Sequence, residues 1–332
     1  MSSTRMELVC PAGTPATLRA AVQAGADAVY CGFRDETNAR NFPGLNFSTE
    51  EMAEGVRFAH AHGSKVLVAI NTFGRVGSVD RWRKAADAAV GCGADAIIAA
   101  DIAVLDHVAS NHKQIRLHLS VQAAAATPEA IGFYAETFGV RRVVLPRVLS
   151  IQEVATLNRE IRVETEAFVF GGLCVMTEGR CYLSSYATGK SPNLNGVCSP
   201  PEMVSYEEDI DGTVARLCGF TIDRYAPGAP VGYPTLCKGR FKAGDKTSYL
   251  FEDPVSLNAG SMIAGLKAAG VTALKIEGRQ RGKGYVTEVV RAFRKAVDAV
   301  EQGSDGIEID RILAGQSEGG RQTTGAYKKS WR

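Results

Sequence analysis

Eight short apolar runs, separated by segments of helical period, are the feature that most limits what this 332-residue chain can fold into. Most of the runs are too continuously apolar for a sheet with one face in water, so we expect strands that are covered on both faces. Strands that alternate with helices are typical of a parallel sheet. The predicted strands are 7–10, 27–31, 65–70, 95–99, 116–120, 142–145, 167–170 and 273–277.

Helix starts lie between these runs. A threonine before a proline places a capping hydroxyl ahead of a residue that favours the first helical turn. A serine followed three residues later by glutamate fits the capping box. These signals are Thr14-Pro15, Ser48-x-x-Glu51, Thr127-Pro128 and Ser150-x-x-Glu153.

Eight strands with eight helical returns favour a closed (β/α)8 barrel of the TIM type. The same string could form an open doubly wound sheet. The open sheet is disfavoured because no G-x-G-x-x-G follows the first strand, where residues 10–13 read Cys-Pro-Ala-Gly. We therefore expect residues 1–332 to form a single barrel domain.

The regular pattern stops after Phe170. Residues 171–248 are rich in Gly, Pro, Ser and Asn, with strand-like pieces at 202–206 and 217–222. This segment is predicted to be an insertion between the seventh and eighth strands, at the end of the barrel where active sites are built. Residues 315–332 are expected to form a flexible tail.

Composition excludes several classes of protein. The net charge of +2 and the scattered Lys and Arg residues give no basic field that would attract nucleic acid. No run approaches the roughly 20 apolar residues needed to cross a bilayer. Residues 1–5 lack the apolar core of a signal peptide, and eight cysteines are too few for a disulfide scaffold, so we expect a cytoplasmic protein.

Four cysteines fall in the insertion, with the spacing Cys174-x6-Cys181-x16-Cys198-x38-Cys237. Clustered thiols in a reducing compartment are more typical of metal or redox chemistry than of disulfides. Four thiolates can hold an iron-sulfur cluster or a zinc ion. Zinc is disfavoured because the spacing contains no Cys-x-x-Cys knuckle.

The other cysteines have a plainer interpretation. Free cysteine is among the most buried residue types, so Cys10, Cys31 and Cys92 are expected in the core. Cys218 is also expected in the core. It is the spare thiol of the insertion, however, and could replace Cys237 as the fourth ligand.

Polar residues follow three of the predicted strands and are candidates for substrate binding. Glu277 and Arg279 end the eighth strand, where arginine could grip a carboxylate, although the two could instead form a surface ion pair. His118 and Gln122 end the fifth strand, although a lone histidine such as His118 is more often a satisfied core residue than a catalyst. Arg40 lies in the loop after the second strand.

Two segments carry a resemblance to a known family. Residues 166–174, Glu-Ala-Phe-Val-Phe-Gly-Gly-Leu-Cys, and 179–184, Gly-Arg-Cys-Tyr-Leu-Ser, are similar to the signature of the collagenase-like peptidase family of the U class, whose members share a barrel. The likeness extends from Glu7 to about Val300. Many members have Gly followed by Ser or Ala where this chain has Gly171-Gly172.

One departure from the family pattern points to a branch. RNA-hydroxylating members have a Cys-x-x-x-Cys pair, whereas this chain has Cys198-Ser-Pro-Pro-Glu202 and the distant Cys237 instead. This replacement resembles the branch of the family that acts in ubiquinone biosynthesis.

The resemblance implies a 4Fe-4S cluster bound by Cys174, Cys181, Cys198 and Cys237. It also implies oxygen-independent hydroxylation of a polyprenyl phenol precursor of ubiquinone, a heterodimer with the sister protein UbiV, and prephenate as oxygen donor. A cluster bound by four protein thiolates has no open iron site. We therefore expect such a cluster to transfer electrons or hold the loop rather than bind substrate.

Three other functions are alternatives for a chain with these motifs. A peptidase is disfavoured because the chain has no His-Glu-x-x-His or Gly-x-Ser-x-Gly motif, and His60 and His62 lie on a helix without suitable partners. An RNA-base hydroxylase is disfavoured because this chain lacks both the Cys-x-x-x-Cys pair and a basic surface run. A non-catalytic subunit, whose cysteine loop serves to bind a partner, remains a separate alternative.

Overall fold

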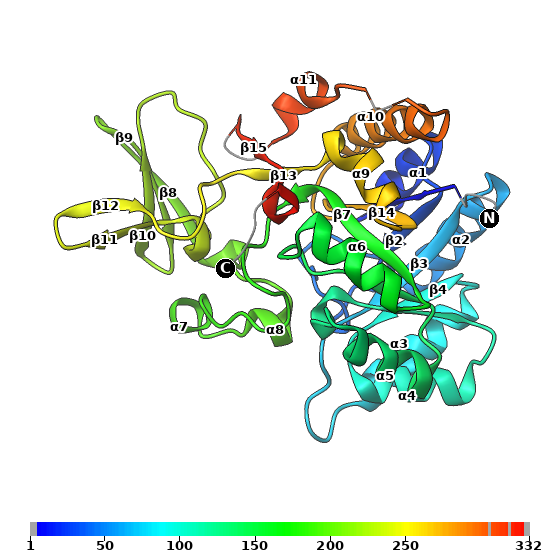
Figure 1. Ribbon diagram of the computed structural model, residues 1–332. Helices are drawn as coiled ribbons and strands as arrows, with labels where there is room; N and C mark the ends of the chain where they lie inside the picture. Colours follow the sequence, from blue (N-terminus) through cyan, green and yellow to red (C-terminus); the bar gives the residue numbers. More distant parts are fainter. Residues whose placement is uncertain (1–4, 305–306, 318–319, 329–332) are drawn as a thin grey trace.

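Eight parallel strands close into a barrel in the computed structural model, which describes residues 5–304, 307–317 and 320–328 (Figure 1). Strand β14 pairs in parallel with both β1 and β7, which closes the sheet and excludes the open doubly wound alternative. All eight predicted strands are confirmed. They are β1 (Glu7–Pro11), β2 (Ala28–Cys31), β3 (Lys65–Ile70), β4 (Ala96–Ala99), β5 (Arg116–Leu119), β6 (Arg142–Val144), β7 (Glu164–Gly172) and β14 (Ala273–Ile276).

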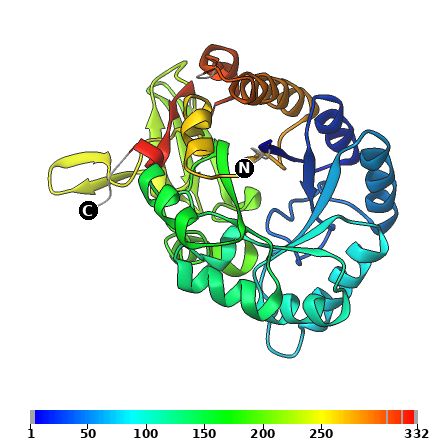
Figure 2. The same ribbon diagram turned by 45° about the vertical axis from the view of Figure 1, so that its right-hand side comes forward.

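Helices form a ring outside the strands, which Figure 2 shows from a second direction. The four predicted capping signals are confirmed, because the side chains of Thr14, Ser48, Thr127 and Ser150 each accept a hydrogen bond from a first-turn backbone N–H. The ring consists of α1 (Pro15–Gln23), α2 (Thr49–Ala61), α3 (Asp80–Gly91), α4 (Ile102–Asn111), α5 (Pro128–Phe138), α6 (Ile151–Glu160), α9 (Ile263–Ala268) and α10 (Lys283–Glu301).

The barrel interior has an apolar layer and an ionic layer. The apolar layer is a separate cluster that includes Val9, Leu67 and Ile98. In the ionic layer the buried Arg142 pairs with Glu7, Glu164 and Glu166, and Glu166 also pairs with the buried Lys275. These charges are paired with one another, and their side chains fill the barrel interior below its mouth.

The insertion after β7 forms two small antiparallel units beside the barrel (Figure 1). The piece predicted at 202–206 starts later, at Val204. The single strand predicted at 217–222 is wrong, because Cys218 and Gly219 have positive φ and form a hairpin turn there. The elements are α7 (Ser185–Thr188), α8 (Pro192–Asn195), η2 (Pro201–Met203), β8 (Val204–Asp209), β9 (Gly212–Leu217), β10 (Phe220–Tyr225), η3 (Leu236–Lys238), β11 (Arg240–Ala243) and β12 (Lys246–Tyr249).

The chain then returns to the strand that it left. β13 (Ser256–Asn258) pairs antiparallel with the end of β7, so that Ser256 faces Gly172. The short helix η4 (Gly260–Met262) leads from β13 into α9. The insertion is therefore fastened at both ends to one barrel strand.

The carboxyl-terminal segment packs against the barrel, contrary to the expected flexible tail over 315–332. β15 (Gln322–Thr323) pairs in parallel with β13, and the Tyr327 hydroxyl, which is buried, donates to the Phe168 carbonyl at 2.7 Å. The tail composition is polar, but this tyrosine supplies the apolar anchor. The other elements are α11 (Asp310–Leu313), η5 (Ala314–Gln316) and η7 (Gly325–Lys328); residues 318–319 and 329–332 lie outside the described residues.

No helix within the described ranges combines the length and the apolarity that a membrane span requires.

Candidate functional site

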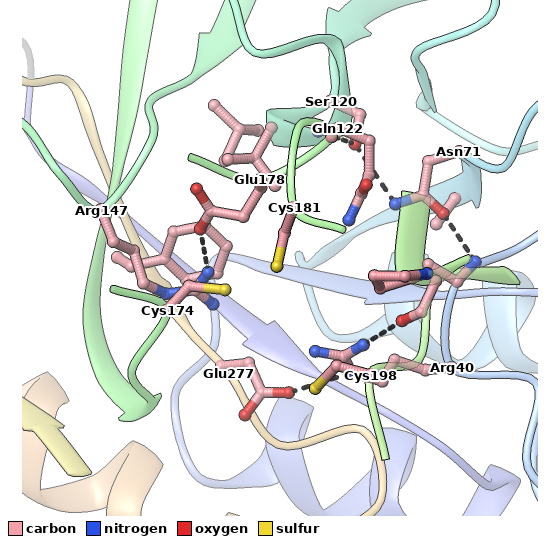
Figure 3. A pocket seen from close by; sticks show the side chains of 18 of the residues that line it. Arg40, Asn71, Ser120, Gln122, Arg147, Cys174, Glu178, Cys181, Cys198 and Glu277 are labelled. Atoms are coloured by element: carbon pink, nitrogen blue, oxygen red, sulfur yellow. Dashed lines mark hydrogen bonds and ion pairs between the residues drawn. The ribbon is translucent and has the colours of Figure 1, made fainter. Parts of the chain in front are cut away.

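A cavity of about 140 Å³ opens at the carboxyl ends of the barrel strands, beneath the insertion (Figure 3). The segments that follow β2, β3, β5, β6, β7 and β14 contribute side chains to it, and the insertion supplies the rest. Its polar and thiol lining consists of Tyr30, Arg40, Asn71, Ser120, Gln122, Arg147, Cys174, Glu178, Cys181, Cys198, Cys237, Lys275, Glu277 and Arg279.

The structure brings the four predicted ligand cysteines to this one cavity. Cys174 and Cys181 lie in the loop after β7, Cys198 follows α8, and Cys237 is in η3. Figure 3 shows the sulfur atoms of the first three directed toward the cavity. Cys218, which was expected in the core, is half-buried on the β9–β10 turn and does not line the cavity.

The cavity offers four cysteine thiols as potential metal ligands. In the described part of the chain, no three cysteine sulfurs lie within 4.8 Å of one another. A tetrahedral zinc ion with Zn–S bonds of about 2.3 Å would hold its sulfurs about 3.8 Å apart. Four cysteines that line one cavity are the ligand set that an iron-sulfur cluster takes.

Two of the thiols, Cys174 and Cys237, are not poised as nucleophiles. Burial raises the pKa of Cys174, and burial together with Cys198 raises the pKa of Cys237 to about 11. A catalytic cysteine needs the opposite shift, which a neighbouring cation or histidine normally supplies. No histidine is among the described residues that line the cavity, so a cysteine-peptidase arrangement is not present there.

Arg147 and Glu178 form a buried ion pair in the cavity wall that the sequence did not reveal. The Arg147 guanidinium also lies over the Phe168 ring, 3.5 Å from its centroid. Burial raises the pKa of Glu178 against the opposing effect of Arg147. Arg147 follows the sixth strand, so its place after a barrel strand was the available signal.

Glu277 lies across the cavity from this pair and interacts with the second-strand loop. Arg40 Nε lies 3.5 Å from Glu277 Oε1, and Arg40 also donates to the Gly196 carbonyl in the insertion. Burial acts to raise the pKa of Glu277, but Arg40 and Arg147 outweigh it and lower that pKa. Arg40 has a φ of 85°, an unfavourable backbone conformation for this residue type.

Arg279 does not form the surface ion pair with Glu277 that was one alternative. Its buried guanidinium donates to Asn38 Oδ1 at 3.0 Å and to the Ala39 carbonyl. Burial lowers the pKa of Arg279 to about 10, so it stays charged at neutral pH. Of the cationic side chains among the described lining residues, Arg279 is the one that has no carboxylate within ion-pair distance.

Neutral polar groups occupy the opposite wall. Asn71, which sequence analysis missed, follows β3 and donates to Ser120 Oγ at 3.2 Å. Gln122 lies in the short helix η1 (Val121–Ala123), and its buried Oε1 has no hydrogen-bond partner among the described residues. Gln122 can therefore accept a hydrogen bond from a ligand.

His118 is placed inside the barrel and not at the cavity. It is buried on β5 with Arg142 and Lys275 close enough to affect its pKa, and neither ring nitrogen has a partner within the described residues. Burial lowers the pKa of His118 well below its usual value. The expectation that it faces substrate fails because its strand position points into the interior, below the mouth.

These features define a (β/α)8-barrel protein with a thiol-lined cavity at the carboxyl ends of its strands. The model of Peptidase family U32 matches residues 13–324, and the chain belongs to that family. The family expected from the signature is thus confirmed.

Three relatives show the range of names within the family. "tRNA hydroxylation protein P1" of Bacillus subtilis is 30% identical over 88% of this chain and 63% of its own length. "23S rRNA 5-hydroxycytidine C2501 synthase" of Escherichia coli is 30% identical over 96% of this chain and 43% of its own length. "Collagenase" of Porphyromonas gingivalis is 29% identical over 92% of this chain and 68% of its own length. The chain therefore spans less than two thirds of the first two relatives.

Proposed function

We propose that this protein is a component of an oxygen-independent hydroxylase that acts on the ring of a ubiquinone precursor. The observation that carries the proposal is that Cys174, Cys181, Cys198 and Cys237 line one cavity at the barrel mouth. These four residues would bind a 4Fe-4S cluster, which supplies one-electron transfer when bound. Two relatives named for RNA hydroxylation support hydroxylation as the reaction class.

The cavity wall offers the contacts that an aromatic ring and an anionic oxygen donor need. Phe168 and Tyr30 supply aromatic surface, and Gln122 Oε1 can accept a phenol hydrogen bond. Arg279 can hold a carboxylate, because its charge is not matched by a contacting carboxylate in the described chain.

A second cavity of about 350 Å³, with several apolar side chains in its wall, could take the start of a polyprenyl tail. It lies between the loop after β2 and the end of α8, and these two segments also line the first cavity. Phe42, Phe73, Trp82 and Leu194 are part of its wall. A tail directed there would leave the ring in the first cavity, beside the cysteines.

Within the family, the pairing of Cys198 with a distant Cys237 resembles UbiU. We therefore assign the chain to that branch, as the partner of UbiV in a heterodimer that takes oxygen from prephenate. The net charge of +2, with scattered basic residues, favours a small substrate over RNA.

The decisive experiment is anaerobic ubiquinone production in cells that lack this gene. Wild type should restore production, whereas Cys237→Ala should not. Arg279→Ala should lose activity while iron, sulfide and the EPR signal of the anaerobically purified protein stay at wild-type levels. Full complementation by Cys237→Ala, or a zinc-loaded and colourless wild-type protein, contradicts the proposal.

RNA-base hydroxylation is the second candidate, and the names of the relatives favour it. It predicts loss of a hydroxylated nucleoside from tRNA or rRNA of the deletion strain, with normal ubiquinone. Mass analysis of nucleosides and the absorbance ratio of the purified protein distinguish the two candidates.

A further inference from the structure

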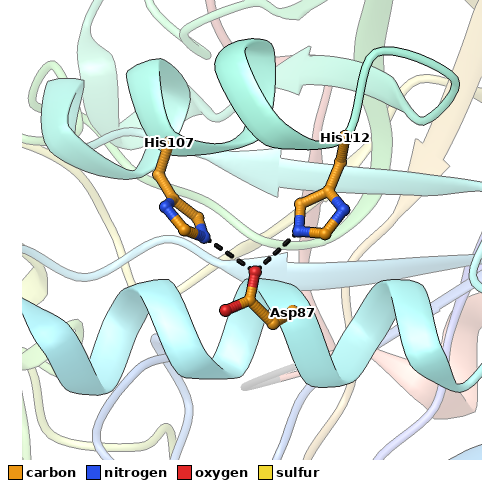
Figure 4. A group of neighbouring side chains, drawn as sticks. All are labelled: Asp87, His107 and His112. Carbon is orange, nitrogen blue, oxygen red and sulfur yellow. Dashed lines mark hydrogen bonds and ion pairs between the residues drawn. The ribbon is translucent and has the colours of Figure 1, made fainter.

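Two imidazoles and one carboxylate converge outside the barrel, where Asp87 of α3 faces His107 of α4 and His112, the residue that follows α4 (Figure 4). Asp87 Oδ1 lies 2.7 Å from His107 Nε2 and 2.6 Å from His112 Nε2. All three ligand atoms lie within 4.8 Å of one another. None of these residues lines the cysteine cavity.

This arrangement differs from an ordinary surface ion pair. Both imidazoles approach the same carboxylate oxygen, and their side chains are only 18% and 23% exposed. His60 and Asp95 provide the contrast, because they form a simple pair at 2.9 Å with a histidine side chain that is 45% exposed. Asp87, His107 and His112, called the triad below, therefore place three potential metal-ligand atoms at one partly enclosed position.

We propose that Asp87, His107 and His112 bind a divalent transition-metal ion of the Zn²⁺ class through two Nε2 atoms and one carboxylate oxygen. Imidazole ligands favour Zn²⁺ over Mg²⁺ and Ca²⁺, which prefer oxygen donors throughout. Three protein ligands leave a fourth position for water, and the Asp87 side chain, 49% exposed, opens that position to solvent.

The ligands need only small movements to reach bonding geometry. With bonds of about 2.0–2.1 Å, a tetrahedral ion holds its ligand atoms about 3.3 Å apart. The nitrogen–oxygen separations of 2.7 and 2.6 Å would therefore widen by about 0.6–0.7 Å on metal binding. Rotation of partly exposed side chains on two helices can supply this change.

Proton positions must change as well. An imidazole that binds metal through Nε2 carries its proton on Nδ1. The amide nitrogen of Asn111 lies 3.3 Å from His107 Nδ1, so the exposed Asn111 side chain must turn its oxygen toward the ring. The bound ion would then connect α3 to α4.

The test compares Zn²⁺ binding by the full chain with that by His112→Gln and His107→Gln, with His60→Gln as the matched control. Wild type and His60→Gln should each bind one more equivalent of Zn²⁺ per chain than His112→Gln and His107→Gln. This difference should hold whether or not the cysteines also bind metal. Binding of this additional Zn²⁺ ion should raise the Tm of the wild-type protein by about 5 °C when the free Zn²⁺ concentration is 100 times the Kd. Far-UV circular dichroism checks that each variant is folded.

Substitution of Co²⁺ for Zn²⁺ identifies the side chains that bind this ion, through the visible absorption spectrum. The difference spectrum between wild type and His112→Gln should show weak visible bands without a thiolate charge-transfer band. Equal Zn²⁺ stoichiometry in wild type and His112→Gln, or a thiolate band in the difference spectrum, would overturn the proposal. The test is independent of the cluster, because both proteins retain every cysteine.

Discussion

The backbone N–H of Gly172 donates to Glu277 Oε2 at 3.1 Å. This bond connects the strand that leads into the cysteine loop with the strand that closes the barrel. Gly171 makes the approach possible: its φ is 110°, and a Cβ built on it would lie 2.5 Å from the Glu277 carbonyl oxygen and 2.9 Å from Glu277 Cβ. Glycine is therefore required at position 171 by its positive φ and by its close packing against the Glu277 backbone.

Gly171→Ala should destabilise the fold by about 2–4 kcal/mol, because the new methyl group meets backbone that cannot yield and the residue is held at positive φ. Gly63→Ala is the matched control, with φ of 77° and open space around the Cβ position. It should cost about 1 kcal/mol. Urea denaturation measures both, and equal losses would show that the contact with Glu277 is unimportant.

Cys237→Ser should abolish the iron and sulfide content of the anaerobically purified protein, because it removes one of the four proposed ligands. Cys218→Ser should leave that content unchanged, since Cys218 lies on a hairpin turn away from the cavity. Iron and sulfide analysis with EPR is the measurement. The reverse result would make Cys218 the fourth ligand, which the sequence alone had left open.

His118 should make the fold sensitive to acid. Burial lowers its pKa in the folded protein, helped by the charges of Arg142, Arg116 and Lys275 and opposed by Glu7. Below about pH 6.5, the pKa of histidine in the unfolded chain, the His118 imidazole binds a proton in the unfolded chain but not in the folded one. The free energy of unfolding therefore falls as pH falls. From pH 7.5 to 5.5 the loss from this residue is about 1.4 kcal/mol.

His118→Leu should remove that part of the acid sensitivity. Denaturation midpoints at several pH values measure it, with the exposed His62→Leu as the control. If the pH profile of His118→Leu matched that of wild type, the residue would not be a neutral buried histidine.

Tyr327→Phe should lower the free energy of unfolding by about 1–2 kcal/mol, because it leaves the buried Phe168 carbonyl without its hydroxyl donor. Tyr186→Phe, at a side chain that is 93% exposed, should have no measurable effect. Thermal or urea melts compare the two variants. Identical curves would indicate that the carboxyl-terminal segment contributes nothing to the barrel.

The barrel was predictable because its determinants are local. Apolar runs and capping residues such as Ser48 and Ser150 lie next to the elements they specify, and β3 (Lys65–Ile70) was predicted with its observed bounds. The place of Arg40, Gln122, Glu277 and the four insertion cysteines at the mouth followed from one rule about strand ends.

The rest depends on contacts between distant segments. Arg147 and Glu178 pair across 31 positions of sequence, and no local pattern marks either residue as buried. The position of His118 could not be decided from the sequence, because a strand end does not reveal which side chain points down the barrel. The strand predicted at 217–222 failed because the turn is made by Cys218 at a φ of 50°, which sequence rules assign to glycine or asparagine.

Because Ser256 pairs with Gly172, the excursion that carries the four cysteines begins and ends at neighbouring points of β7. Changes in its length or content leave the spacing of the eight barrel strands untouched. The scaffold and the cysteine-bearing segment thus meet at one strand end, so the length of the segment is not fixed by the geometry of the barrel.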